Sequence, residues 1–534
     1  MFDDLKMFAR YAFGLRHFLR ESLTSEECRR MIAAQLGNRA QSFLLLMQKG
    51  VFANPRSPYR KLLSYAGVEF GDLVRCVEQD GIESTLEKLY AEGVYINYEE
   101  FKCRQPIERG TLRISLTPRD FDNPLLARSY QGKTGGSRGA GTRVAIDLDL
   151  LTYEAAHFDL FEGALGVHKR PIAVWRPVPP AVSGTRVVLK LAKLGWPVEQ
   201  WYSQNRFKPT MSTAHYFLIA AATVYGSEFF GHPVPRPEYV PLDNVSVVAR
   251  WLETQRHQGM PGTVFTQASS AVRVCRAALD ESIDVSGSFF IVGDEPYTSA
   301  KARVIEQAGC RAATYYAMAE IGTVGEPCGG PKASDDMHLL EDKLAVIQKE
   351  KRVINSEYLV EALLYTTLLP SSPKIMLNTD TSDYGVLEKR DCNCPAGAFG
   401  LKTHLSGIRS YDKLTSEGVA FIGSDLIQLL EEVMPEKFGG YPTDYQFVEE
   451  EENGLPKLCL RVSPRIGPVG EQPMVDAVLE VLDAKPGANQ MMADRWRQAR
   501  AIQVVRGEPY ATFAGKILPL HMVHAPRADK AEQK

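Results

Sequence analysis

A glycine-rich segment gives this chain a dense set of donors for phosphate. It reads KTGGSRGAGTR from Lys133 to Arg143. Glycines let backbone N–H groups approach a phosphate closely, and hydroxyls and cations add donors and positive charge. The segment fits neither the strand–loop–helix phosphate motif nor the dinucleotide fingerprint, and a glycine-rich hairpin tip would have a similar composition. The residues that we expect to contact phosphate are Thr134, Gly135, Gly136, Ser137, Arg138 and Gly139.

Three later segments each place charged residues among small or apolar neighbours. Glu320 ends the run TYYAMAE, which follows a predicted strand. A lone carboxylate at the end of a strand suits Mg²⁺, and an exposed loop glutamate is the alternative. Asp380 and Asp383, in NTDTSD, could accept hydrogen bonds from sugar hydroxyls, and Lys516, in the otherwise apolar EPYATFAGKILPLH, could be brought to an anion. Each segment alone is a weak indication of ligand binding, and the order of the segments along the chain is more specific.

Cysteine spacing points to a metal. Cys392 and Cys394 are separated by one residue, and Cys328 precedes His338 on an earlier segment. Three thiolates and an imidazole form a closed tetrahedral zinc site, so we expect these four residues to hold a structural Zn²⁺ that joins two loops. The alternative is a set of unrelated free thiols. The remaining cysteines are expected to be small core side chains: Cys28, Cys76, Cys103, Cys275, Cys310 and Cys459.

The elements that position these residues alternate between strand and helix. Residues 289–292 are apolar, Gly293 ends the run, and residues 299–310 follow a helical pattern before a second strand-like run over 311–316. Such β–α–β alternation predicts parallel sheets covered by helices, with ligands at the carboxyl ends of the strands. The proline-rich residues 176–184 are expected to form a surface loop.

The last hundred or so residues predict a smaller α/β unit. Two strand-like runs flank EEEENGLP, and the glutamates 449–452 are expected in a solvated turn. The chain has 534 residues, which exceeds the size at which one hydrophobic core stops growing. We therefore expect a multi-domain α/β protein, with a large domain over residues 1–408 and a small domain over residues 409–534.

Composition narrows the classes of partner. Lys and Arg number 62 against 65 Asp and Glu, so neither nucleic acid nor a charged membrane is indicated. No apolar run reaches the roughly 20 residues of a membrane span. Nine cysteines without a repeating framework favour a reducing compartment, and we expect a cytoplasmic protein. No His-Glu-x-x-His motif is present to support a metalloprotease.

Taken in order, the charged and glycine-rich segments resemble the adenylate-forming, or acyl-activating, enzyme superfamily. TGGSRG is similar to its phosphate loop, and residues 316–320, YAMAE, to its AMP and magnesium motif. Residues 381–383, TSD, are similar to its ribose motif, and residues 514–516, AGK, to its adenylation motif. Ala317 and Ala319 depart from the family pattern, which has a glycine and a hydroxyl residue there. SPYRKLLSYAGV, YEEFKCRQPIERG, SFFIVGDEPYT and the cysteine–histidine set resemble the phenylacetate-CoA ligase branch.

The resemblance implies an activity, a set of residue roles and a mobile small domain. The chain would use ATP to convert a carboxylic acid, of aryl or arylacetic type, to an acyl adenylate and would then transfer the acyl group to coenzyme A. Alternative acceptors are an amine, a carrier-protein thiol or an inorganic nitrogen nucleophile, and a nucleotide-binding protein without catalysis is a further alternative. A homodimer is one possible oligomeric state. The implied catalytic residues are Lys516, Glu320 with Mg²⁺, and Arg409, and the implied ligand-binding residues are Tyr316, Asp383 and Gly418.

Overall fold

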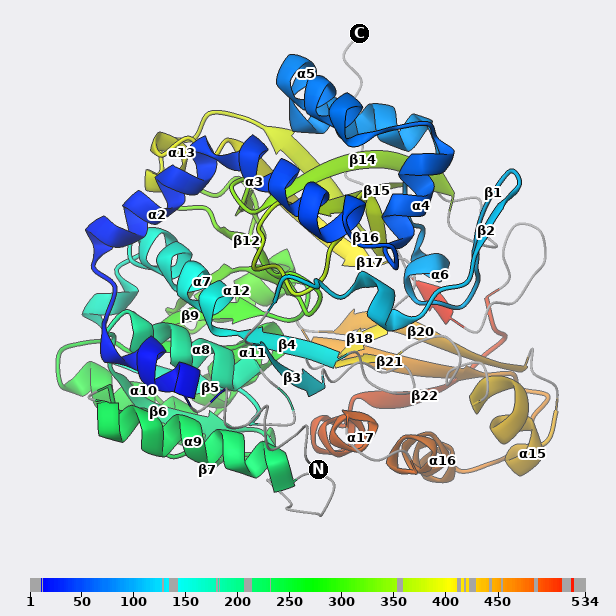
Figure 1. The fold of residues 1–534 in the computed structure, drawn as a ribbon. Coiled ribbons are helices and arrows are strands. Elements are labelled where there is room, and N and C mark those ends of the chain that lie inside the picture. The colour runs from blue at the N-terminus through cyan, green and yellow to red at the C-terminus, as the bar shows by residue number, and fades with distance from the viewer. Residues whose placement is uncertain are drawn as a thin grey trace, which may run out of the picture.

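The structure is a computed structural model of the chain (Figure 1). It describes residues 11, 13–126, 129–133, 143–178, 181, 183–205, 214–230, 232–352, 359–410, 414–416, 419–421, 429–440, 444–452, 455–484, 488–510 and 520–522. The predicted residues Thr134, Gly135, Gly136, Ser137, Arg138, Gly139, Gly418 and Lys516 lie outside this part of the chain. Within the described part, every helix is too short or too polar to span a lipid bilayer.

A six-stranded parallel sheet confirms the predicted β–α–β alternation. Its order is β10 (Arg311–Thr314), β9 (Phe289–Gly293), β8 (Thr263–Gln267), β5 (Ile172–Trp175), β6 (Val198–Ser203) and β7 (Glu238–Tyr239). Ile172 and Val174 pack into one core cluster and Ala173 and Trp175 into another. Both faces of the sheet are therefore buried, as a parallel sheet requires.

Helices cover these two faces. One cluster includes α7 (Leu148–Phe161) and α8 (Ser183–Lys193), and the other includes α10 (Ser246–His257), α11 (Ala268–Asp280) and α12 (Ser299–Gln307). The helix α9 (Ala214–Phe230) packs beside α8. Strands β3 (Ser129–Lys133) and β4 (Arg143–Asp147) pair antiparallel, so the glycine-rich segment connects the two strands of a hairpin.

A seven-stranded antiparallel sheet follows directly in the chain. Its order is β11 (Tyr316–Met318), β12 (Gly322–Pro327), β13 (Met337–Leu339), β17 (Thr403–Ser410), β16 (Thr379–Lys389), β15 (Leu359–Thr367) and β14 (Leu344–Arg352). Only Tyr315 separates β10 of the parallel sheet from β11. The predicted AMP motif therefore begins where the chain passes from one sheet to the other.

Amino-terminal helices pack on the second sheet, as the blue ribbons of Figure 1 show. They are α3 (Arg39–Leu46), α4 (Pro58–Tyr65) and α5 (Phe70–Ala91), and α2 (Ser25–Gly37) packs on α7. The short helix α6 (Tyr98–Phe101) packs on β16, and β1 (Ile107–Arg109) pairs with β2 (Leu112–Ile114). The chain before β3 thus encloses the strand that carries the predicted ribose motif.

The carboxyl-terminal part has its own sheet and core. The sheet order is β22 (Ile502–Arg506), β21 (Leu455–Val462), β20 (Tyr445–Glu452) and β23 (Leu520–Met522), with α16 (Glu471–Asp483) and α17 (Ala488–Ala499) packed on it. Strands β18 (Leu414–Ser416) and β19 (Val419–Phe421) form a separate pair. The glutamates 449–452 belong to β20, so the expected turn over them was wrong. The predicted boundary after residue 408 falls inside β17 and remains a prediction.

One helix of this part docks on the parallel sheet. Arg495 of α17 is 3% exposed and donates to Oδ1 of Asn205, just after β6, at 3.2 Å. Arg273 of α11 donates to the carbonyl of Ala499 at 3.3 Å. The two parts of the chain therefore share a contact that buries a charged side chain.

Candidate functional site

Two predicted nucleotide-binding residues lie in contact. The hydroxyl of Tyr316, at the start of β11, donates to Oδ2 of Asp383 in β16 at 2.7 Å, and the Thr381 hydroxyl donates to the same oxygen at 2.8 Å. Burial, reinforced by the negative charge of Asp383, raises the pKa of Tyr316 well above its usual range. The phenol is therefore a fixed donor at neutral pH. The structure brings together the predicted AMP and ribose motifs, 67 residues apart in the sequence.

The ribose motif has an unusual backbone. Ser382 has φ +73°, in the left-handed region that non-glycine residues seldom adopt. Its N–H donates to Oδ1 of Asp380 at 2.8 Å, and its hydroxyl lies 2.9 Å from that of Ser410 in β17. Such strained positions cluster at ligand sites because the surrounding contacts must enforce them. Here the strained turn places Asp383 beside Tyr316.

Glu320, the predicted magnesium ligand, forms an ion pair. Its Oε1 lies 3.1 Å from Nζ of Lys102, and the two side chains are 11% and 20% exposed. The partner follows α6 in the amino-terminal part of the chain. The alternative of a freely exposed loop glutamate is therefore wrong.

A buried acid and a buried lysine hold the turn after Glu320. Oε1 of Glu154, in α7, accepts from the N–H of Thr323 at 2.8 Å, and Lys343 donates to the carbonyl of Ile321 at 3.1 Å. Gly322 between them has φ +78°, and an added Cβ would lie 2.0 Å from Oε1 of Glu154. Only glycine fits this conformation and this space.

Cations surround Glu154. Arg186 donates to both of its oxygens at 2.9 and 2.8 Å, and Lys343 and Lys190 lie 3.6 and 3.9 Å away. Burial alone would raise the pKa of Glu154, but the three cations outweigh burial and hold the pKa well below its usual range. An ionised carboxylate therefore fixes the peptide next to the candidate metal ligand.

The predicted catalytic residue Arg409 lies near the end of β17. It is paired with Tyr384 of β16 in the sheet, one residue beyond Asp383. Its guanidinium donates to its own neighbour's carbonyl, that of Ile408, at 2.7 Å and lies 3.6 Å from Asp335. Arg409 is thus close in sheet register to the ribose motif, and its catalytic role stays a prediction.

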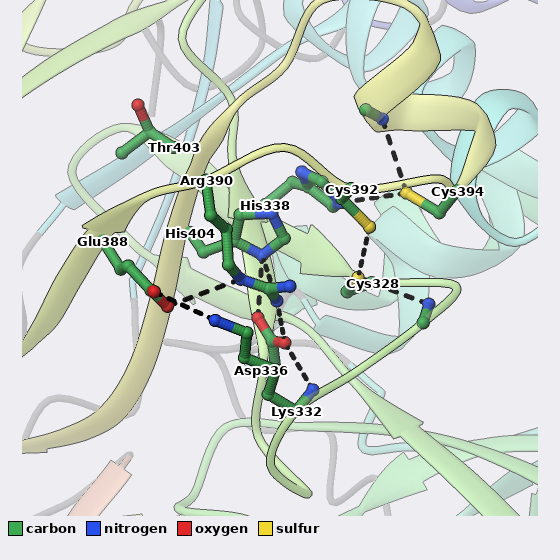
Figure 2. Close-up of polar contacts among 12 residues, drawn as sticks. Cys328, Lys332, Asp336, His338, Glu388, Arg390, Cys392, Cys394, Thr403 and His404 are labelled. Atoms are coloured by element: carbon green, nitrogen blue, oxygen red, sulfur yellow. Dashed lines mark hydrogen bonds and ion pairs between the residues drawn. The ribbon is translucent and has the colours of Figure 1, made fainter.

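Figure 2 shows the four predicted zinc ligands gathered in one cluster. Their ligand atoms all lie within 4.8 Å of one another. The Sγ atoms of Cys328 and Cys392 are 3.5 Å apart, and Nε2 of His338 is 3.0 Å from Sγ of Cys394. The two predicted pairs therefore meet in space, and metal binding by them remains a prediction.

Neighbouring strands and backbone hydrogen bonds orient the four candidate zinc ligands. Cys328 follows β12, His338 lies in β13, and Cys392 and Cys394 lie between β16 and α13 (Pro395–Ala398). Backbone N–H groups donate to the sulfur atoms of Cys328 at 3.3 Å and of Cys394 at 3.4 Å. Nδ1 of His338 lies 3.0 Å from the carbonyl of Leu401, which assigns the ring proton to Nδ1 and leaves Nε2 to face the sulfurs.

Protonation suits a cation at this cluster. Burial lowers the pKa of His338 to about 4, so its ring is neutral, the form that binds metal. Burial raises the pKa of Cys328 to about 12, so a bound cation is what would ionise it. Three sulfur atoms and one imidazole nitrogen fit a closed structural zinc site.

A second group of polar residues borders this cluster. Nδ1 of His404 lies 2.8 Å from Asp336, which also forms an ion pair with Arg390 and accepts from the N–H of Lys332 at 2.7 Å. The rings of His404 and His338 are 4.0 Å apart. The acid and the arginine thus support the candidate metal ligands from outside.

Sequence reasoning missed three residues of this site: Lys102, Glu154 and Lys343. The first two contact the AMP motif or its following turn from 218 and 169 residues away in the chain. Each lies in an ordinary amphipathic or polar stretch, so no local pattern marks it. Only the fold reveals these partners.

Comparison with known proteins gave structural likenesses alone. No family model matches the chain, and no curated protein matches it. A 2-hydroxyisobutyryl-CoA ligase in complex with 2-HIB-AMP and CoA has TM-score 0.48 and 16% identity over 94% of this chain and 91% of that one. An o-succinylbenzoate CoA synthetase from Bacillus subtilis has TM-score 0.38 and 12% identity over 73% and 67%. An ATP-bound MatB from Rhodopseudomonas palustris has TM-score 0.32 and 11% identity over 76% and 68%. Values this low assign neither a family nor a reaction, so we base the proposed function on the residues of this chain.

Proposed function

We propose that this chain is an adenylate-forming enzyme of the phenylacetate-CoA ligase-like type. It would use ATP to convert a carboxylic acid to a bound acyl adenylate and pyrophosphate, and would then transfer the acyl group to the thiol of coenzyme A. The hydrogen bond of 2.7 Å between Tyr316 and Asp383 carries the proposal, because it joins the two motifs that would hold AMP and ribose. The resemblance to that branch favours an aryl or arylacetic acid as the substrate.

Each described residue has a task in this reaction. Asp383 would accept hydrogen bonds from the ribose hydroxyls, and Tyr316 would contact the AMP moiety. Glu320 would hold Mg²⁺, which supplies positive charge to the leaving pyrophosphate when bound. The attacking carboxylate is already ionised at neutral pH, so the reaction needs no general base.

Residues outside the described part, together with Arg409 of β17, complete the proposal. Lys516 would bridge the attacking carboxylate and the α-phosphate, while Thr134, Ser137 and Arg138 would donate to the other phosphates. Gly418, which has no side chain, suits a strand that passes close to the thiol. Arg409 would assist from the predicted boundary between the domains.

We also propose that Cys328, His338, Cys392 and Cys394 hold one structural Zn²⁺. The loop after β12 would then be tied to the loop after β16, the strand that carries Asp383. The metal would thus hold the end of β12 at a fixed position relative to the end of β16.

Pyrophosphate exchange tests the proposed activity. Purified protein should exchange labelled pyrophosphate into ATP only when a suitable acid is present, and a panel of aryl, arylacetic and aliphatic acids identifies the acid. Formation of an acyl thioester on addition of coenzyme A would identify coenzyme A as the acceptor of the acyl group. Amines, carrier-protein thiols and inorganic nitrogen nucleophiles are tested as acceptors in the same assay. Protein that binds ATP but shows no exchange with any acid would contradict the enzymatic proposal.

Substitution of Lys516 separates the two half-reactions. Lys516→Ala should lower adenylation by roughly a hundredfold or more, because a positive charge at the developing phosphate charge is lost. Transfer from a supplied acyl adenylate should continue. The matched control is Lys437→Ala, which removes a surface lysine paired with Glu480. Normal adenylation by the Lys516 variant would remove this residue from the mechanism.

A further inference from the structure

Lys102 occupies a fixed position at the candidate magnesium ligand. Its Nζ lies 3.1 Å from Oε1 of Glu320 and 5.0 Å from the centroid of the Phe101 ring. Asn97 caps the preceding helix α6, because its side chain accepts from the N–H of Glu100 at 3.0 Å. The ammonium group is therefore held by a capped turn and an aromatic face, with a fifth of the side chain open to solvent.

The segment that carries Lys102 is paired with the residues just before the ribose motif. The N–H of Ile96 donates to the carbonyl of Asn378 at 3.2 Å, and the N–H of Asp380 donates to the carbonyl of Ile96 at 2.9 Å. Residues 96–102 thus run from the start of the ribose motif to Glu320. This short segment contacts the strand of the proposed ribose ligand at Ile96 and the proposed metal ligand, Glu320, at Lys102.

A nucleotide at this site would need a positive charge close to its phosphates. ATP carries several negative charges, whereas Glu320 and Asp383 are both acids. Two other cations near these motifs also pair with carboxylates: Lys351 pairs with Asp380, and Arg409 lies 3.6 Å from Asp335. A lysine has three N–H donors, so one can remain on Glu320 while others reach a further anion.

We propose that Lys102 is a nucleotide-binding residue that donates to a phosphate oxygen of ATP while it shares Glu320 with the metal. This inference rests on the proposed function, because it requires a nucleotide at Tyr316 and Asp383. It adds a phosphate contact from the amino-terminal part of the chain to those expected from residues 134–139 and Lys516. The competing explanation is a purely structural ion pair that holds α6 against β11.

Equilibrium binding of ATP, AMP and adenosine separates these explanations. Lys102→Met should weaken ATP binding roughly 10- to 100-fold, the usual worth of a charge-assisted hydrogen bond, and should leave adenosine within about twofold. Lys102→Arg should stay within about threefold for all three ligands, because it keeps a cationic donor. The loss of ATP affinity should persist when Mg²⁺ is removed with EDTA, because the contact is to phosphate.

The control is Lys332→Met, which breaks the exposed pair of Lys332 with Glu388 at 3.0 Å and should change none of the three affinities. Lys102→Gln replaces the methionine variant if the latter does not fold. Unchanged ATP binding, equal weakening of adenosine and ATP, or a loss that disappears in EDTA would each overturn the inference alone. Wild-type protein that binds none of the three ligands would overturn the proposed function and the inference with it.

Discussion

Replacement of Glu154 by glutamine tests how the turn after Glu320 is held. The side chain of Glu154 is fully buried, and three cations lie within 4 Å of it: Arg186, Lys343 and Lys190. Glu154→Gln keeps the shape and an acceptor for the N–H of Thr323 but leaves these cations without their anion. Removal of one partner from a buried ion pair costs about 3–5 kcal/mol, a large part of the roughly 5–15 kcal/mol that stabilises a typical domain.

Urea unfolding followed by circular dichroism measures this cost. The control is Glu281→Gln, because Glu281 forms an exposed pair with Arg250 that is worth less than about 1 kcal/mol. Although burial alone would raise the pKa of Glu154, the cations hold it below the value of an unfolded glutamate, about 4.3. The stabilisation is therefore present above that pH and declines as the pH falls below it, so the variant and wild type should converge in acid. A loss no larger than that of Glu281→Gln at neutral pH would refute the reasoning.

Three further predictions concern the same site. Gly322→Ala should destabilise the protein by about 1–3 kcal/mol, because of its positive φ and the blocked Cβ position, whereas Gly467→Ala, with open space around it, should not; thermal unfolding compares them. Elemental analysis should find about one zinc per chain, and Cys394→Ser should lose it while Cys76→Ser, a half-buried free thiol, should keep it; a stable wild-type protein without metal would contradict the zinc proposal. Asp383→Asn should weaken ATP binding roughly tenfold or more but spare inorganic pyrophosphate, and unchanged ATP binding would argue against a ribose contact.

Local patterns predicted much of the fold. The apolar run at residues 289–292, the helical pattern after it and the next strand appear as β9, α12 and β10 of one parallel sheet. The two strand-like runs that flank EEEENGLP appear as the antiparallel strands β20 and β21. These elements were predictable because side-chain periodicity and turn residues act over a few neighbouring positions.

Two predictions failed for reasons of tertiary packing. The proline-rich residues 176–184 were expected at the surface, but Arg176 is fully buried, where it forms an ion pair with Asp294 and donates to the carbonyl of Thr266 at 2.6 Å. The glutamates 449–452 continue β20 because the partner strand β21 extends along them. In both cases distant partners decided the outcome.

The candidate site was partly predictable. The spacing of Cys392 and Cys394 marked them as a pair, and the charged residues of the AMP and ribose motifs stood out among small neighbours. The contact of Lys102 with Glu320 could not be predicted from local composition. It depends on how the end of α6 is placed against the turn after β11, 218 residues later in the chain. Local composition identifies candidate ligands, while the sheet order decides which of them meet.

The docking of α17 limits how the carboxyl-terminal part can move. Separation from the parallel sheet would expose the buried guanidinium of Arg495 and remove its acceptor on Asn205. A small displacement would separate the guanidinium from Asn205 before water could reach it, which would leave a buried charge without its acceptor. The predicted motion of this part should accordingly favour discrete positions over a continuous slide.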